Sequence, residues 1–232
     1  MIDAQLLDDV RRLRAAGATP KEIARELGVR PAVVAPLVRH VAAERDRGRT
    51  GEADLFGCWV SPGWSRELLV ASREGWDDVD LGDDGPAGVA LALVARAERG
   101  DRVTVCGFLV DTFCLGVKDA IGPERMRDRD LPAFVRTYFK VFPSPPLRAP
   151  IELARHLVLG AAEFASGLGF ASHPDFEAAR GHLGAGELDG PCAITFGREG
   201  RPLYVQGPYD DPIAIVATLR ATIGAEGFVI AA

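Results

Sequence analysis

The longest run of hydrophobic residues in the chain lies between Arg102 and Ala120. Alternate positions are apolar on both sides of an extended chain there, with Val103 and Val105 on one side and Cys106 and Phe108 on the other. A strand that is apolar on both faces is covered on both faces. The run therefore predicts the central strand of a buried sheet.

Shorter segments with alternating hydrophobic positions, bounded by turn residues, predict further strands at 67–72, 89–96, 192–196, 203–205 and 228–230. Segments 192–196 and 203–205 are expected to form a hairpin. Hydrophobic positions at helical spacing predict helices at 130–142, 150–167 and 211–223. Strands joined by tight turns, together with separate helices, indicate an α+β class. We expect residues 57–232 to form an α+β domain with a mainly antiparallel sheet and packed helices.

The first 45 residues show the helical period in three short segments. Thr19 and Glu22 form a capping box around Pro20, which marks the start of the second segment. Gly28 and Pro31 separate it from the third. We expect a three-helix domain at residues 1–45, followed by a linker at 46–56, which is polar and has no hydrophobic period.

The segment ATPKEIARELGVRPAVVAPLV, residues 18–38, resembles the helix-turn-helix of bacterial transcriptional regulators. The signature positions are occupied by Ile23 and Ala24, by Leu27, Gly28 and Val29, and by Val34. The resemblance covers residues 3–45 only, and residues 57–232 resemble no family of known activity. It implies that the predicted three-helix domain is a helix-turn-helix, and that its third helix enters the major groove of DNA.

The third helix departs from the family pattern in its side chains. Where such helices carry Ser, Thr or Arg, this chain has Ala32, Val33 and Ala35. Arg30, Arg39 and His40 remain as candidate DNA-binding residues, and they suit phosphates better than base edges. The alternative is a helical module that packs on the rest of the chain or dimerises.

The charge is divided unevenly along the chain. Residues 1–50 carry ten Arg and Lys against seven Asp and Glu, net +3, and the remainder carries 17 against 26, net −9. A basic N-terminal segment followed by an acidic domain is typical of nucleic-acid-binding proteins, although a net charge of +3 is small for a basic patch.

Asp111 is a carboxylate inside the longest apolar run. An ionised side chain is stable there only with a cationic or hydrogen-bonding partner. Cys114, Lys118 and Asp119 follow at the end of the strand, where ligand sites are often built. These four residues are the candidate ligand site. Lys118 as a counter-ion for Asp111 is the structural alternative to a Cys–Lys–Asp catalytic group, which would require a lowered thiol pKa.

Other motifs argue against metals, cofactors and membranes. The four cysteines, Cys58, Cys106, Cys114 and Cys192, are widely spaced, so neither disulfides nor zinc is expected. His173 and His182 lie on opposite sides of a predicted helix and cannot bind one ion. We expect no cofactor. Because no apolar run reaches about 18 residues and the N-terminus lacks a signal-peptide core, we expect a cytoplasmic protein.

Two functions fit these features. The first is a DNA-binding regulator, homodimeric because paired heads bind paired half-sites, whose α+β domain binds a small molecule or a protein partner. The second is an enzyme of unknown class with its site at Asp111, Cys114, Lys118 and Asp119, whose head serves docking or dimerisation. The enzyme requires a concave pocket with Asp111 on its wall, and the regulator requires a pocket or apolar patch on the same domain. The sequence identifies no catalytic residue.

The first function predicts retention of the protein on duplex DNA at low salt. Affinity should fall steeply as salt rises, because each Lys or Arg contact to a phosphate displaces counterions. Arg30→Ala or Arg39→Ala should remove most of the retention. A gel-shift titration at stepped salt measures this, and no retention at the lowest salt would exclude DNA binding as the function.

Overall fold

The computed structural model describes residues 54–82, 86–184, 188 and 190–231, and within the first 53 positions residues 6, 9–10, 12–13, 18–30, 33–34 and 36–38. The chain divides into two compact units, Met1–Ala53 and Asp54–Ala232. No helix within these described residues combines the length and apolar character that crossing a membrane requires.

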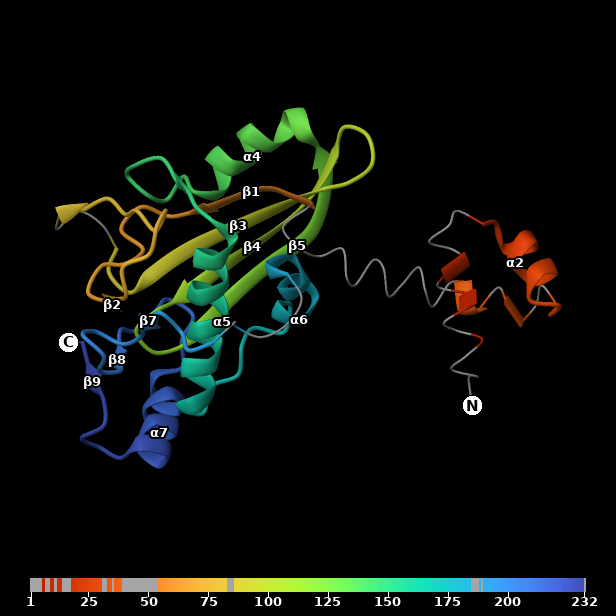
Figure 1. Cartoon of the computed structure of the whole chain (residues 1–232). Helices are drawn as coiled ribbons and strands as arrows, with labels where there is room; N and C mark the ends of the chain where they lie inside the picture. The colour runs from red at the N-terminus through yellow and green to blue at the C-terminus, as the bar shows by residue number, and fades with distance from the viewer. Residues whose placement is uncertain are drawn as a thin grey trace. The chain divides into compact units, whose positions relative to one another are not determined.

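The larger unit is built around an antiparallel sheet, so the predicted α+β domain is confirmed (Figure 1). Its five strands lie in the order β5-β4-β3-β1-β6. They are β1 (Leu55–Val60), β3 (Val89–Ala97), β4 (Arg102–Asp111), β5 (Gly116–Arg127) and β6 (Leu147–Arg148). Every neighbouring pair in this sheet is antiparallel.

The apolar run 102–120 is a hairpin and not a single strand, which corrects the prediction. β4 ends at Asp111, residues 112–115 turn, and β5 returns from Gly116, so that Asp111 lies opposite Gly116. Hydrophobic alternation cannot separate one long strand from two joined by a tight apolar turn. The turn is apolar because Phe113 and Cys114 are themselves buried.

Helices cover the two faces of the sheet to different extents (Figure 1). The 17-residue helix α5 (Ile151–Gly167) packs on one face, where Phe108 and Val110 of β4 meet its residues Leu157 and Ala161 in the largest hydrophobic cluster. On the other face α4 (Leu131–Tyr138) covers Val103 and Val105 with only eight residues. The unequal lengths leave part of the second face without a helix.

Short elements complete the larger unit. α6 (Phe176–Ala179) continues into a 3-10 turn (Arg180–Leu183), and another 3-10 turn (Asp128–Asp130) precedes α4. The predicted hairpin 192–205 is wrong: β7 (Ile194–Thr195) pairs with β2 (Leu69–Val70), and β8 (Leu203–Tyr204) pairs in parallel with β9 (Val229–Ile230). α7 (Pro212–Ile223) connects β8 to β9. Each of these strands has two residues, so alternation alone could not identify its partner.

The three-helix domain predicted for residues 1–45 is wrong. Of the described residues in this stretch, a helix with defined bounds is formed by α2 (Pro20–Glu26), and the other described residues in helical conformation are 6, 9–10, 12–13, 33–34 and 36–38. Thr19 caps α2 through the predicted capping box with Glu22. Periodicity indicates which residues favour a helix, but segments this short have little helical stability of their own, so it does not determine a bundle.

Gly116 provides a test of how β5 packs on α5. Its φ is +68°, and a Cβ there would lie 2.6 Å from Ala165 Cβ and 2.8 Å from Ala161 O. Gly116→Ala should therefore lower the free energy of unfolding by about 2–5 kcal/mol, combining left-handed backbone strain with overpacking. The matched control is Gly100→Ala, where φ is +76° and no atom lies within 4 Å. It should cost about 1–2 kcal/mol, and urea denaturation giving equal losses would contradict the packing.

Candidate functional site

Asp111 closes the turn between β4 and β5. Its Oδ1 accepts the backbone N–H of Phe113 at 2.9 Å and that of Cys114 at 2.8 Å, and the residue is 7% exposed. Burial raises the pKa of Asp111, and the two N–H donors act in the opposite direction. Backbone donors of the turn thus supply the hydrogen-bonding partner that the sequence required.

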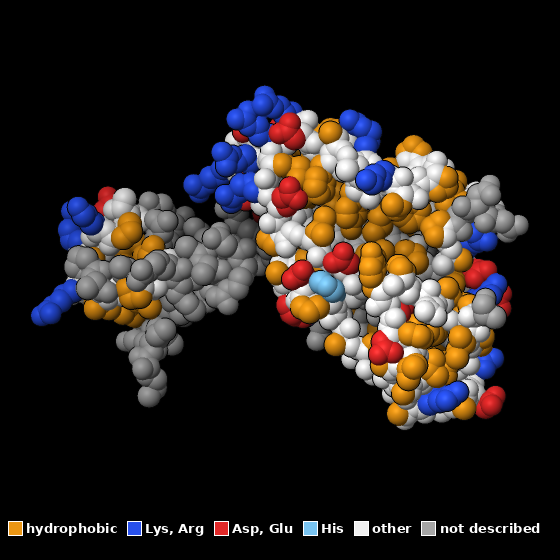
Figure 2. All heavy atoms as spheres, turned by 180° about the vertical axis from the view of Figure 1, so that it is seen from behind, with side chains coloured by type: hydrophobic (Ala, Val, Ile, Leu, Met, Phe, Trp, Pro, Cys, Tyr) orange, Lys and Arg blue, Asp and Glu red, His pale blue; other side chains and the backbone are white. Residues whose placement is uncertain are grey.

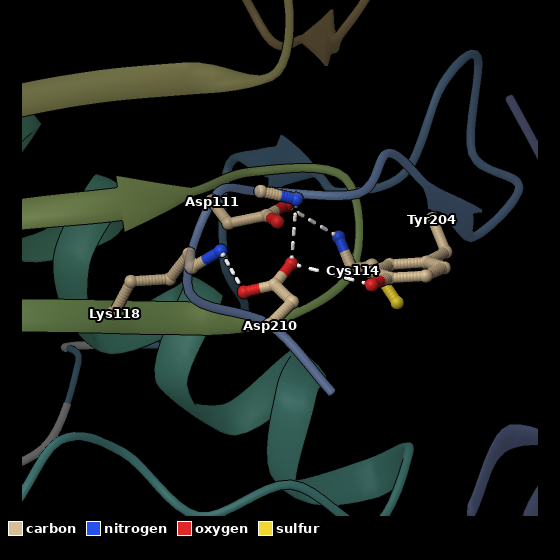
Figure 3. Close-up of polar contacts among 6 residues, drawn as sticks. Asp111, Cys114, Lys118, Tyr204 and Asp210 are labelled. Carbon is tan, nitrogen blue, oxygen red and sulfur yellow. Dashed lines mark hydrogen bonds and ion pairs between the residues drawn. The ribbon is translucent and has the colours of Figure 1, made fainter. Parts of the chain in front are cut away.

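Lys118 forms its ion pair with Asp210 and not with Asp111. Nζ of Lys118 lies 2.7 Å from Oδ1 of Asp210, and the Asp210 side chain is 7% exposed (Figure 3). Oδ2 of Asp210 accepts the Gly207 N–H at 2.8 Å and the Tyr204 hydroxyl at 3.4 Å. Asp210 therefore ties the loop 205–211 to strand β5.

Cys114 belongs to the hydrophobic core. It is fully buried in a cluster with Leu115, Leu168 and Tyr204. Burial, reinforced by the negative charge of Asp111, raises the pKa of the Cys114 thiol to about 12. A catalytic cysteine requires a lowered thiol pKa, so the Cys–Lys–Asp catalytic group is not supported.

Asp119 differs from the other two carboxylates because its side chain is 54% exposed. It lies opposite Leu109 on β4. Nδ1 of His173 is 3.8 Å from Oδ1 of Asp119, and the backbone N–H of His173 donates to Val117 O at 2.9 Å. The loop that carries His173 is thereby held along β5, beside Asp119.

These residues surround one cavity of about 630 Å³, here named the sheet-end cavity. The polar part of its wall consists of Asp111, Lys118, Asp119, His173, Gln206 and Asp210. The apolar part includes Val89, Leu109, Phe113, Val205 and Pro208, with Tyr209 at the loop tip. Three of the four predicted site residues therefore line a single cavity, and Cys114 is not among the lining residues.

Sequence reasoning missed Asp210, Tyr204 and the position of His173. Lys118 and Asp210 are separated by 92 residues, and no local pattern relates them. The segment GPYDD at 207–211 indicated only a turn before a helix. For His173 the sequence argued only against a shared metal ion with His182, and the structure places it beside the carboxylate of Asp119.

A second hollow, of about 720 Å³, lies between α5 and α6. Two of its charged side chains, Glu177 and Arg180, pair with each other at 3.2 Å, and Glu163 and His173 also form part of its wall. None of the four predicted site residues lines this hollow, whereas three of them line the sheet-end cavity.

The predicted DNA-binding residues lie in the smaller unit. Arg30 is exposed, and Arg39 and His40 lie outside the described residues. The described part of the smaller unit therefore contains one of the three predicted DNA contacts, and DNA binding stays a prediction.

The Asp210 carboxylate should make stability depend on pH. Burial alone would raise the pKa of Asp210, but the Lys118 and Gly207 hydrogen bonds and the Lys118 charge outweigh it, and the pKa lies below its ordinary value. Such a group stabilises the fold above its unfolded pKa, and this contribution is lost as pH falls through the folded pKa. Asp210→Asn should therefore cost about 1–3 kcal/mol near neutral pH and progressively less below about pH 4.

Urea denaturation of the protein and of Asp210→Asn, at neutral pH and at about pH 3, measures this difference in stability. The control is Asp101→Asn, at an exposed carboxylate in the β3–β4 turn, which should change stability by less than about 0.5 kcal/mol. An Asp210→Asn effect of the same size at both pH values would show that the charged form of Asp210 does not stabilise the loop.

Comparison of the chain with protein-family models, with curated proteins and with solved structures finds no match. The functional argument therefore depends on the geometry of the sheet-end cavity.

Proposed function

We propose that the Asp54–Ala232 unit is a ligand-binding module and that the sheet-end cavity is its site. The observation that carries the proposal is the cavity itself, with polar groups on one part of its wall and apolar groups on the other. Its volume of about 630 Å³ lies within the range of roughly 300–1,000 Å³ that small-molecule sites occupy.

The walls of the cavity are held in place without a ligand. The Lys118–Asp210 ion pair and the Gly207 hydrogen bond tie down the loop 205–211, and Asp111 fixes the turn after β4. A site whose walls are already ordered spends less free energy on ordering when a ligand enters. The loop tip is the exception: Tyr209 is 98% exposed, and its ring would gain contacts from a ligand at the cavity mouth.

Binding fits this wall better than catalysis does. The described lining residues include no serine, threonine or cysteine, and the Lys118 side chain is ion-paired with Asp210. Covalent catalysis needs a nucleophile activated by a neighbouring base. The enzyme interpretation is left with the carboxylates and His173, and His173 and Asp119 lie 3.8 Å apart.

In a regulator, ligand binding to this module would change how residues 1–53 bind their partner. The sequence predicts duplex DNA as that partner. Ligand and DNA would be coupled if each altered the affinity of the other by the same factor.

The test is a thermal-shift screen of small molecules on the full chain. A ligand at about 100 times its Kd should stabilise the fold by about 2.7 kcal/mol, which raises Tm by roughly 5–10 °C for a unit of this size. Val205→Trp, at a 47% exposed lining residue, should fill the cavity and reduce the shift to below about 1 °C.

The matched control is Val229→Trp, at a residue that is 39% exposed and lies outside the lining of the cavity. It should retain the full shift. The proposal fails if no compound shifts Tm, or if Val205→Trp and Val229→Trp respond alike to a compound that does.

A further inference from the structure

The face of the sheet that α4 covers has an uncovered end. α4, with eight residues, is about 12 Å long, whereas β4, with ten, extends about 33 Å. The residues beyond α4 on that face are hydrophobic, and Val89 is 37% exposed. We name this area the open strip, formed by Val89, Leu109 and Ile121. Figure 2, which views the molecule from behind relative to Figure 1, shows a broad hydrophobic area on this unit.

The open strip carries its own hollow, of about 290 Å³, beside the sheet-end cavity. Its walls include Leu91, Gly107, Ile121, Tyr138 and Val141. Leu109 and Asp119 line both hollows, and these two residues are cross-strand partners. The two hollows therefore share one residue pair, and an elongated molecule that crosses this pair would occupy both.

The charges around this groove favour a cation. The described lining of the sheet-end cavity has three carboxylates, Asp111, Asp119 and Asp210, against one Lys, Lys118, which pairs with Asp210. Asp119 is the one charged side chain among the described residues that line the strip hollow. An anion would meet two carboxylates, whereas a cation would meet complementary charge. A cation would also stabilise the ionised form of Asp111, whose burial opposes ionisation.

We infer that the ligand is an amphiphilic amine, with its ammonium group between Asp119 and Asp111 and its hydrocarbon chain on the open strip toward Tyr138 and Val141. This inference rests on the proposed ligand-binding function and specifies the chemical class of the ligand. The exposed side chain of Val141, at 72%, would be covered by the far end of the chain.

Isothermal titration calorimetry of the full chain with four probes tests the inference. n-Octylammonium should bind, and octanoate, which has the same length and the opposite charge, should bind at least tenfold more weakly. n-Octanol is the neutral probe of the same length and should fall between them. n-Butylammonium should bind at least tenfold more weakly than n-octylammonium, since each buried CH₂ contributes up to about fourfold.

Variants test where the ammonium group and the hydrocarbon chain of the ligand bind. Asp119→Asn should weaken the binding of n-octylammonium by about fivefold, which is the contribution of a partly exposed ion pair. It should leave the binding of n-octanol unchanged. Asp175→Asn is the matched control, because Asp175 is also 3.8 Å from His173 Nδ1 but lines neither hollow. It should leave n-octylammonium binding unchanged. Val141→Ser should weaken n-octylammonium and not n-butylammonium.

The outcomes separate this inference from the proposed function. Equal affinity for octanoate and n-octylammonium, or no effect of Asp119→Asn, overturns the ligand class. The ligand class is also overturned if n-octylammonium does not bind while another compound binds and loses its binding in Val205→Trp. In that case the proposed binding module still stands. If no compound of any charge binds, both the class and the module fail.

Discussion

The ion pair between Lys118 and Asp210 is the interaction on which the candidate site depends. It joins strand β5 to the loop 205–211, two parts of the chain that no strand pairing connects among the described residues. The Asp210 side chain is almost fully buried, and both of its oxygens are engaged, by Lys118 on one side and by Gly207 and Tyr204 on the other. A carboxylate satisfied in this way tolerates burial. Without it, the loop would lose its ion pair to β5, which holds one wall of the cavity.

A second constraint comes from the lengths of the elements. The β4–β5 hairpin extends well past the eight-residue helix α4, so one end of a hydrophobic face has no helix over it. The Asp210 loop approaches this end from one side, and the loop carrying His173 is tied to β5 through Val117. Exposed apolar surface bordered by polar groups is typical of binding sites. The arrangement explains why the polar and apolar walls of the cavity occur together.

The sequence predicted those parts of the site that depend on local pattern. Asp111 stood out because it lies inside the longest apolar run, Lys118 and Asp119 because they lie near its end, and all three line the cavity. Cys114 was included for the same reason, yet the apolar neighbours that made the run conspicuous also bury its thiol. Asp210 and His173 come from distant loops, and pairing across 92 residues depends on tertiary packing that no local pattern encodes. The predicted three-helix head failed for a related reason, because helical period does not specify how short segments pack.

Hydrogen–deuterium exchange of the free protein tests most directly whether this ion pair holds the cavity wall. Lys118→Met keeps most of the side-chain volume and removes the charge. The account predicts that peptides covering residues 203–211, including the Gly207 amide, exchange faster in Lys118→Met, while peptides from β3 and β4 exchange as in the unmodified protein. Unchanged exchange in residues 203–211 would contradict it, since the loop would then be held by something other than Asp210 and Lys118.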